Sequence, residues 1–281
     1  MRLFYYKDEE LYCHHSLDER PVEANFRMHA HEMLEIYHFI SGDAAYMVEG
    51  RQYALTPGDV MIMRAAETHK LQLGSDAPYE RIAIHFSKTL LSGLDPEGRL
   101  LRPFYDRELG HNNRFAAGSL PAERLAACFG GFDMDVGDER LARLHVLSRL
   151  LPVLTELSLA FSDGTPDSAG VTGPAAGIVA YVNDRLFGEL SLEAVSREFY
   201  MSRSQLERTF RRATGSSLWE YVKIKRLLAA RERIASGEGA AQAAASCGFR
   251  DYSAFYRAYR RHFGHSPVRD APERGAGNAA F

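Results

Sequence analysis

Between residues 25 and 87, the apolar positions fall in short segments that have the composition of β-strands. Four turn signals separate these segments, namely Ser41-Gly42-Asp43, Glu49-Gly50-Arg51, Thr56-Pro57-Gly58-Asp59 and Gly74-Ser75-Asp76. Many short strands at this spacing are typical of an all-β sandwich or barrel. The first part of the chain is therefore predicted to form a small β-barrel.

In the last third of the chain, the apolar pattern changes to the 3.6-residue period of helices, and the sequence repeats itself. At an offset of 49 residues, six residues coincide with identical ones: Ser204, Arg208, Arg211, Arg212, Gly215 and Ser217 with Ser253, Arg257, Arg260, Arg261, Gly264 and Ser266. A repeat of this kind indicates two copies of one structural unit.

Each copy predicts two short helices that are joined by a tight turn. The expected N-caps are Ser191 and Ser202 in the first copy and Asp251 in the second, where Gly248 is suited to a left-handed helix stop. A longer helix is predicted between the copies, over residues 218–234. Two short helices with a tight turn and a basic second helix form the helix-turn-helix pattern.

Composition adds a difference in charge between the two parts of the chain. The 281 residues carry a formal charge of −3, but residues 174 onward contain 17 Lys and Arg against 11 Asp and Glu. A basic C-terminal part on an acidic body favours a nucleic-acid-binding module joined to a domain of another function.

The same composition argues against a membrane or secreted protein. No uninterrupted apolar run approaches the roughly 20 residues of a membrane helix, and the first residues lack the apolar segment of a signal peptide. A cytoplasmic protein without membrane contact is therefore expected. Cys13, Cys128 and Cys247 are too far apart in sequence for a disulfide framework or a zinc-binding pair.

About ninety residues of the C-terminal part carry a specific set of motifs. The first copy contains Leu206-x-Arg208-x-Phe210-Arg211-Arg212-x-Thr214-Gly215, and the second ends in Phe263-Gly264-x-Ser266-Pro267. Two linked copies with this ending resemble the DNA-binding domain of AraC/XylS-family transcription regulators. The resemblance implies double-stranded DNA as a partner.

By this resemblance, six side chains of the two second helices contact base edges: Ser204, Glu207, Arg208, Tyr252, Ser253 and Arg257. Their chemistry agrees, because Arg binds guanine, Glu accepts from cytosine and an aromatic ring packs on a thymine methyl group. Five further arginines are better suited to neutralising phosphates: Arg203, Arg211, Arg212, Arg260 and Arg261. The alternative for Arg208 or Arg257 is an ion pair with a carboxylate of the protein's own surface.

Within the predicted barrel, the run His29-x-His31-x3-Glu35-x6-Gly42 is followed by Pro57-Gly58-Asp59 and His69. This order resembles the two motifs of the cupin barrel, which is also the usual sensory domain of AraC/XylS regulators. Strand alternation is expected to place His29, His31, Glu35 and Tyr37 on one inward face. The predicted effector pocket therefore consists of His29, His31, Glu35, Tyr37 and His69, whereas His38 and His85 are expected to be satisfied or surface groups.

Three uses of this cluster remain open. His29, His31, Glu35 and His69 are candidate ligands of a divalent transition metal, as in enzymatic cupins. The same residues could instead bind a polar organic effector without metal, or serve a structural role only. The prediction adopted is an effector pocket with no cofactor.

Two helices are predicted between barrel and DNA-binding domain, over residues 121–129 and 139–161. Pro152 is expected to kink or break the second helix. This helix carries a stripe suited to a two-helix interface, made of Leu147, Leu150, Leu154, Leu157 and Phe161. Such a stripe is more often intramolecular core, but the family commonly dimerises through this region, so a homodimer is predicted. The resemblance also implies contact with RNA polymerase.

The predicted fold class is α+β with two domains: an N-terminal cupin-like β-barrel with a helical dimerisation segment, and a C-terminal all-α double helix-turn-helix. The predicted boundaries are 1–118 for the barrel, 119–162 for the dimerisation segment, 163–173 for a linker, 174–270 for the DNA-binding domain and 271–281 for a flexible tail.

The predicted function is sequence-specific transcription regulation, as an activator that senses a small polar effector such as a sugar, without enzymatic activity. Two alternatives belong to other classes. One is a metal-dependent cupin enzyme, an oxygenase or isomerase, fused to a DNA-binding domain. The other is an architectural DNA-binding protein without a ligand.

Overall fold

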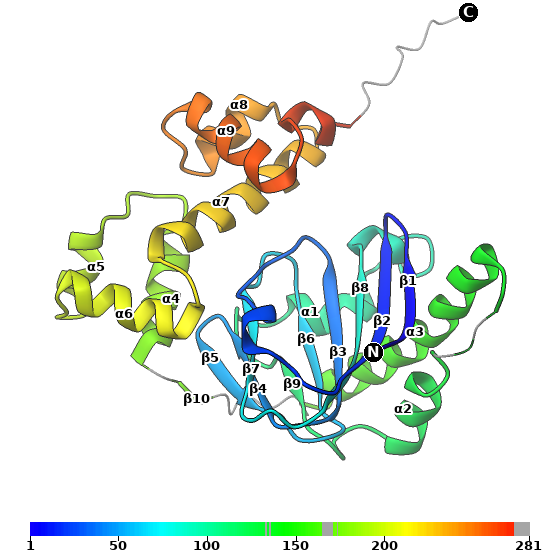
Figure 1. Ribbon diagram of the computed structural model, residues 1–281. Coiled ribbons are helices and arrows are strands. Elements are labelled where there is room, and N and C mark those ends of the chain that lie inside the picture. Colours follow the sequence, from blue (N-terminus) through cyan, green and yellow to red (C-terminus); the bar gives the residue numbers. More distant parts are fainter. Residues whose placement is uncertain (133, 135, 165–170, 173, 273–281) are drawn as a thin grey trace, which may run out of the picture. The chain divides into compact units, whose positions relative to one another are not determined.

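The computed structural model describes residues 1–132, 134, 136–164, 171–172 and 174–272. The chain divides into two compact units, Met1–Ala176 with Ala213–Gly215, and Gly177–Arg212 with Ser216–Phe281 (Figure 1). The predicted tail lies outside the described residues from position 273 onward, as do residues 165–170 and 173 of the predicted linker.

The first unit contains two antiparallel sheets. The six-stranded sheet has the order β1 (Arg2–Lys7), β2 (Leu11–Asp18), β8 (Tyr79–Phe86), β3 (Leu34–Ser41), β6 (Val60–Met63) and β9 (Arg114–Phe115). The four-stranded sheet has the order β10 (Val171–Thr172), β5 (Arg51–Ala54), β4 (Ala44–Val48) and β7 (His69–Leu73). Short 3-10 helices η1 (Glu23–Asn25), η2 (Lys88–Leu91) and η3 (Arg99–Leu101) connect them.

The turn between β4 and β5 illustrates how local sequence sets this topology. Val48 pairs with Arg51, so the loop consists of Glu49 and Gly50 alone. Both residues have positive φ, 48° and 79° respectively. Two consecutive positive φ angles define the hairpin turn whose twist matches that of paired strands.

Two parts of the sheets lie outside the segment in which strands were predicted. Strands β1 and β2 precede residue 25, although alternate residues of β2 are buried as in any half-buried strand. Strand β10 falls in the predicted linker, where Val171 pairs with Gln52 of β5. The two-residue β10 is too short for its alternation to be recognised.

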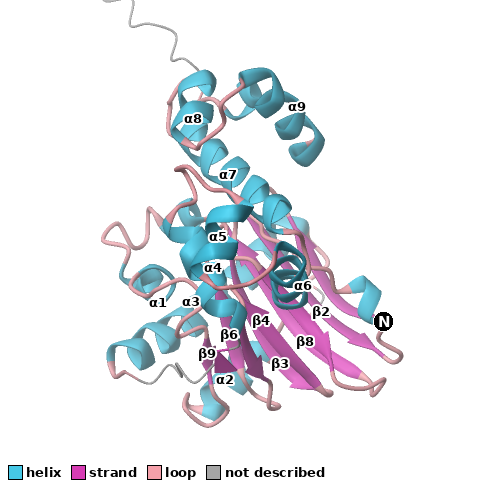
Figure 2. Ribbon diagram, turned by 90° about the vertical axis from the view of Figure 1, so that its left-hand side faces the viewer, coloured by secondary structure: helices cyan, strands magenta, loops and turns pink. Residues whose placement is uncertain are grey.

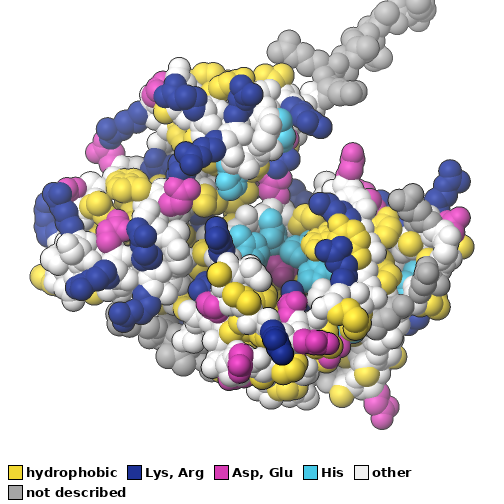
Figure 3. All heavy atoms as spheres, viewed as in Figure 1, with side chains coloured by type: hydrophobic (Ala, Val, Ile, Leu, Met, Phe, Trp, Pro, Cys, Tyr) yellow, Lys and Arg dark blue, Asp and Glu magenta, His cyan; other side chains and the backbone are white. Residues whose placement is uncertain are grey.

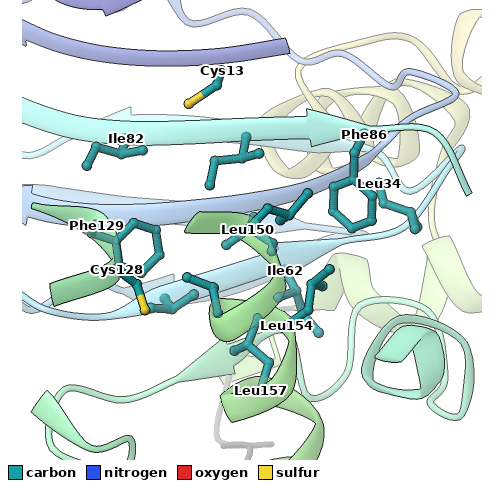
Figure 4. Packing of buried hydrophobic residues seen from close by; sticks show 14 of the residues in the cluster. Cys13, Leu34, Ile62, Ile82, Phe86, Cys128, Phe129, Leu150, Leu154 and Leu157 are labelled. Carbon is teal, nitrogen blue, oxygen red and sulfur yellow. The ribbon is translucent and has the colours of Figure 1, made fainter. Parts of the chain in front are cut away.

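The six-stranded sheet is buried on both faces. One face meets the four-stranded sheet across an aromatic and methionine-rich core that includes Tyr37, Tyr46 and Met61. The other face is covered by α1 (Arg102–Tyr105), α2 (Ala122–Phe129) and α3 (Glu139–Ser162) (Figure 2). Figure 4 shows Leu34, Ile62 and Phe86 of the sheet gathered with Leu150 and Leu154 of α3.

Helix α3 contributes its predicted leucine stripe to this core. Leu150, Leu154 and Leu157 are fully buried, and the helix continues through Pro152, so the predicted break does not occur. Residues Arg140–Ser162 are long and apolar enough to cross a membrane by length and composition. Their packing on the sheet is that of a core helix in a globular domain.

The second unit is helical. It contains most of α4 (Pro174–Asp184) and of α6 (Arg203–Thr214). It also contains α5 (Leu192–Glu198), α7 (Leu218–Ala235), α8 (Ala240–Ser246), α9 (Tyr252–Phe263) and the 3-10 helix η4 (Pro267–Asp270). The predicted caps are confirmed, because Ser191, Ser202 and Asp251 accept hydrogen bonds from backbone N–H groups of the first turns of α5, α6 and α9.

The turns of the two helix-turn-helix copies differ in one residue type. Gly248 follows α8 with a φ of +80°, as predicted, whereas Tyr200 follows α5 with a φ of +52°. A left-handed conformation costs a non-glycine residue roughly 1 to 2 kcal/mol. The Tyr200 side chain is 97% exposed, so packing within the chain does not offset this cost.

We predict that Tyr200→Gly stabilises the second unit by about 0.5 to 1 kcal/mol, because the relief of strain exceeds the extra entropy of glycine in the unfolded chain. Urea denaturation followed by helical circular dichroism measures this change. Tyr200→Phe, which keeps the strain, is the control and should leave the midpoint unchanged. An equal or lower midpoint for Tyr200→Gly would contradict the prediction.

Candidate effector pocket and DNA-binding surface

Four of the predicted pocket residues form one cluster in the barrel. One ligand atom each of His29, His31, Glu35 and His69 lies within 4.8 Å of all the others. Glu35 lies on β3 and His69 begins β7, but His29 and His31 precede β3 and do not share its alternation. The backbone brings them in instead, since His29 and His69 exchange two backbone hydrogen bonds of 3.1 and 2.9 Å.

The backbone also sets the tautomers of the three histidines. Nδ1 of His29 lies 2.9 Å from the carbonyl oxygen of Arg27, Nδ1 of His31 lies 2.8 Å from that of Met33, and Nδ1 of His69 lies 2.8 Å from that of Glu67. A carbonyl oxygen only accepts, so each Nδ1 carries the hydrogen. In a neutral ring, each Nε2 is then an acceptor.

Two of these Nε2 atoms face the same carboxylate oxygen. Oε2 of Glu35 lies 2.9 Å from Nε2 of His31 and 3.0 Å from Nε2 of His69. The contact with His69 lacks hydrogen-bond geometry, which leaves this buried Nε2 without a hydrogen-bond partner among the described residues. Acceptors that face each other at such distances require a proton or a cation between them.

The electrostatics of the cluster keep Glu35 ionised. Burial alone would raise the pKa of Glu35, but the nearby rings of His85 and His69 and the hydrogen bond with His31 hold it well below its usual value. Burial would lower the pKa of His69, and Glu35 outweighs that effect and raises it. The cluster is thus a buried negative charge surrounded by imidazole rings.

A second buried network supports the backbone at His69. The Glu67 carboxylate is fully buried and pairs with both Nη atoms of Arg107 at 2.7 and 2.8 Å. It also accepts from the backbone N–H of Gly110 at 2.8 Å and from Asn113 Nδ2 at 3.1 Å. Burial opposes ionisation of Glu67, yet Arg107 lowers its pKa to about 2. This network holds the turn whose carbonyl orients His69.

Sequence reasoning missed two histidines of the pocket. His85 lies directly opposite Glu35 on β8, with its Nε2 3.9 Å from Glu35 Oε1, so the expectation that it is a satisfied or surface group is wrong. His14 of β2 lines the cavity beside Glu35. His38 points to the other face of the sheet, where its ring stacks on Phe129 at 4.3 Å. No local signal in the sequence distinguishes the pocket-lining histidines from His38, because the register between strands determines which face each one occupies.

The cavity next to the cluster measures about 150 Å³, which is enough for a molecule the size of benzene. Tyr37, the fifth predicted pocket residue, lines it and shares a hydrogen bond with Tyr79. Arg81 lines the same cavity, paired with Asp18 and with its guanidinium carbon 4.7 Å from the centre of the Tyr79 ring. In Figure 3, histidine side chains gather in a hollow of one face.

The cluster also fits a divalent transition metal. Three imidazole nitrogens and one carboxylate oxygen are the donors that zinc and related ions take in proteins. Metal-binding histidines almost always donate their other N–H to a carbonyl or carboxylate, as all three do here. The buried Nε2 of His69 has no hydrogen-bond partner among the described residues, so its lone pair could bind such an ion.

The predicted base-contacting residues lie on α6 and α9 of the second unit. Five of the six are exposed, namely Ser204, Arg208, Tyr252, Ser253 and Arg257, and Glu207 is half-buried. Within the described part of the chain, Arg208 and Arg257 form no salt bridge. The predicted phosphate contacts Arg211, Arg212, Arg260 and Arg261 are exposed as well, whereas Arg203 pairs with Glu193.

Comparisons with known proteins match both units. Residues 17–131 match the AraC-like ligand binding domain, and residues 195–269 match a helix-turn-helix domain. The HTH-type transcriptional activator RhaS of Shigella sonnei is 24% identical over 257 residues, which cover 90% of each chain. RhaS of Salmonella agona is 25% identical over 256 residues with the same coverage.

Among solved structures, the DNA-binding domain of AdpA in complex with a target DNA is 33% identical to this chain. It aligns with 34% of this chain and 87% of its own, with a TM-score of 0.32.

A ligand-binding barrel joined to a double helix-turn-helix defines a ligand-responsive transcription regulator that binds double-stranded DNA. The two domain matches, and relatives that align over 90% of each chain, place the chain more narrowly: it belongs to the AraC/XylS family. The predicted family and the α+β fold class with two domains are thereby confirmed.

Proposed function

We propose that this protein is a cytoplasmic, sequence-specific transcription activator in which α6 and α9 each read one major groove. The observation that carries this proposal is the equivalence of the two helices. Each begins at a capped turn and exposes an arginine at the same position of the repeat, Arg208 and Arg257, without an ion pair in the described chain. Activation is proposed from the RhaS relatives, which are named activators.

Ser204 and Glu207 join Arg208 in the first base-contacting set, and Tyr252 and Ser253 join Arg257 in the second. Arg203, Arg211, Arg212, Arg260 and Arg261 are proposed to bind phosphates. Arg203 is already paired with Glu193, so its phosphate contact requires that exposed pair to open.

Arg208→Ala and Arg257→Ala are each expected to cost about 1 to 3 kcal/mol of discrimination between the operator and unrelated DNA. Binding to the DNA upstream of the gene, with excess competitor and across a salt series, measures this loss. Arg233→Ala, on α7 and paired with Glu238, is the control and should bind as the wild type does. Unchanged discrimination in both variants would exclude the proposed readout.

The barrel is proposed to bind a small polar effector, such as a sugar, at His29, His31, Glu35, Tyr37 and His69. The cavity of about 150 Å³ favours a small ligand, and its tyrosine hydroxyls, imidazoles and guanidinium suit hydroxyl or carboxylate groups. Effector binding then shifts the equilibrium between states that differ in DNA binding, by as much as the effector's affinities for the two states differ. The relatives are regulators, so a cupin enzyme is not favoured.

A second candidate for the same site is a divalent metal ion that forms part of the effector pocket. The specific observation in its favour is the set of three Nδ1–carbonyl contacts, which leaves three Nε2 acceptors beside one buried carboxylate. When bound, such an ion would supply a Lewis-acidic position for an effector oxygen.

If the cluster binds metal, zinc or nickel added to chelator-treated protein should stabilise the first unit by about 2.7 kcal/mol at one hundred times the dissociation constant. Differential scanning calorimetry and metal analysis after dialysis give the two measurements. His69→Ala should abolish the effect, and His262→Ala, in the other unit, should retain it. Equal melting temperatures with and without both metals would leave the effector pocket as the only proposed use.

A homodimer is proposed through the outward face of α3. The central leucines of the stripe predicted for this role, Leu150, Leu154 and Leu157, are buried in the core of the first unit. Leu141, Leu144 and Leu159 are instead 54%, 60% and 55% exposed on the other side of the helix. Exposed leucines on the outward side of one helix favour a protein partner. Contact with RNA polymerase is proposed from the activator relatives alone.

Leu144→Glu is expected to convert the dimer to a monomer, because it places a charge in the apolar contact without touching the core. Analytical ultracentrifugation over a concentration series measures the association. Leu94→Glu, at a leucine that is 67% exposed elsewhere, should remain dimeric. A wild type that stays monomeric throughout the series would overturn the proposed dimer.

A further inference from the structure

The second unit contains two separate hydrophobic cores. The first core holds α4, α5, α6 and the beginning of α7, with Phe210 and Tyr221 among its buried residues. The second core holds the end of α7, α8 and α9, with Leu227 and Phe255 among its buried residues. Helix α7 contributes buried residues to both cores, and in Figure 1 it runs from the helices of the first core to those of the second. The angle between α6 and α9 therefore depends on α7 and on any contact that bridges the two halves.

Arg226 of α7 makes such a bridge. Its Nε donates to the carbonyl oxygen of Leu186 at 2.7 Å and its Nη2 to that of Gly188 at 3.0 Å, both in the loop after α4. Its Nη1 donates to the carbonyl oxygen of Gly248 at 2.5 Å, in the turn between α8 and α9. One side chain thus links the first half of the unit to the second helix-turn-helix.

The turn at Gly248 is shaped for this contact. A Cβ atom at this position would lie 2.8 Å from Cζ of Arg226 and 2.9 Å from the carbonyl oxygen of Phe187. Neither distance is tolerated without movement, so only glycine lets the second helix-turn-helix approach the first half this closely. The positive φ of +80° adds the same requirement.

Burial lowers the pKa of the Arg226 guanidinium, and the carbonyl groups around it oppose this effect by attracting a cation. The loop of Leu186 and Gly188 follows the C-terminal end of α4, and Gly248 follows that of α8. Helix C-termini carry partial negative charge and unpaired carbonyl groups, which a nearby cation stabilises. The planar guanidinium offers five donors in fixed directions, so it can bind three carbonyls at once, which an ammonium cannot do with the same geometry.

A second link across this junction is weaker. Arg250, after α8, pairs with Glu189 at 2.8 Å, but these side chains are 84% and 91% exposed. Exposed ion pairs contribute little because water and salt screen them. Arg226 is half-buried and is therefore the main contact that sets the angle.

We propose that Arg226 is a positioning residue that fixes the orientation of α9 relative to α6, and through it the spacing of the two DNA half-sites that the protein accepts. The inference rests on the proposed function, in which both helices read DNA. Without this contact each core keeps its own buried residues, so each helix still recognises its half-site. One additional base pair between the half-sites turns one of them by about 34° relative to the other. A fixed angle between α6 and α9 therefore accepts only one separation, and loss of the Arg226 contact removes this restriction.

The experiment is a selection from random duplexes of about 30 base pairs by the full chain, followed by sequencing of the bound DNA. Wild type is expected to select two sequence blocks at one separation. Arg226→Met, which keeps the apolar stem of the side chain and removes its donors, should select the same blocks at several separations. On a duplex with one base pair inserted between the blocks, wild type should lose about tenfold in affinity and Arg226→Met less than about threefold.

The ratio of affinities on the two duplexes does not depend on the fraction of active protein, so a partly unfolded variant still gives a result. Gly248→Ala should relax the spacing as Arg226→Met does, because its Cβ displaces the guanidinium, and it serves if Arg226→Met does not fold. Arg233→Ala, seven residues further along α7, is the matched control and should keep the wild-type spacing.

The outcomes distinguish a failure of the proposed two-helix readout from a failure of the proposed role of Arg226. A wild type that selects no pair of blocks overturns the proposed two-helix readout and the role of Arg226 with it. Two blocks at one fixed separation for both wild type and Arg226→Met overturn only the role of Arg226. Restoration of the fixed separation by Arg226→Lys would show that charge alone sets the spacing, and would overturn the three-carbonyl geometry.

Discussion

The register of β3 between β6 and β8 is the constraint on which the first unit depends. Glu35 lies opposite Met63 and His85 and faces the barrel interior, whereas the next residue, Ile36, lies opposite Ile62 and Ile84 and faces α3. Because side chains alternate, a slip by one residue would exchange the two faces. An ionised carboxylate would then enter the apolar core beneath the helices, which is prohibitive without a partner. The sheet is buried on both sides, so both the core and the pocket enforce the same register.

The pocket forms because this register is combined with contacts between distant segments. His29 and His31 come from a loop and reach Glu35 through the backbone bridge to His69. The Glu67–Arg107 network, far from them in sequence, holds the turn that orients His69. A buried charge is thus kept ionised by groups whose own positions are set by backbone carbonyls. The same arrangement serves a polar effector or a metal ion, because both need fixed donors and acceptors in a site with little water.

The second unit contains the helix-turn-helix motif twice, and the two turns differ in the residue that they require. At the turn of the second copy, glycine is required by both the positive φ and the approach of Arg226. At the turn of the first copy, Tyr200 adopts the same conformation at a cost and extends into solvent. The repeat is therefore symmetric in its caps and cores, while the contact between its halves is made at one turn only.

The sequence by itself determined the local features of this protein. The repeat, the three N-caps, the Gly248 stop and the Glu49-Gly50 hairpin follow from residue types at short spacing. Such features depend on hydrogen bonds and φ angles within a few residues, which local sequence specifies.

Only the tertiary structure decided which face each element buries. His85 and His14 line the pocket because β8 pairs with β3 on one side and β2 on the other. The leucine stripe of α3 packs on the sheet and turns other leucines outward, and Arg226 meets carbonyls some 40 and 22 residues away. These contacts join residues far apart in the chain. The pattern along one segment can show that a face is apolar or that a side chain carries donors, but not which distant segment will meet it.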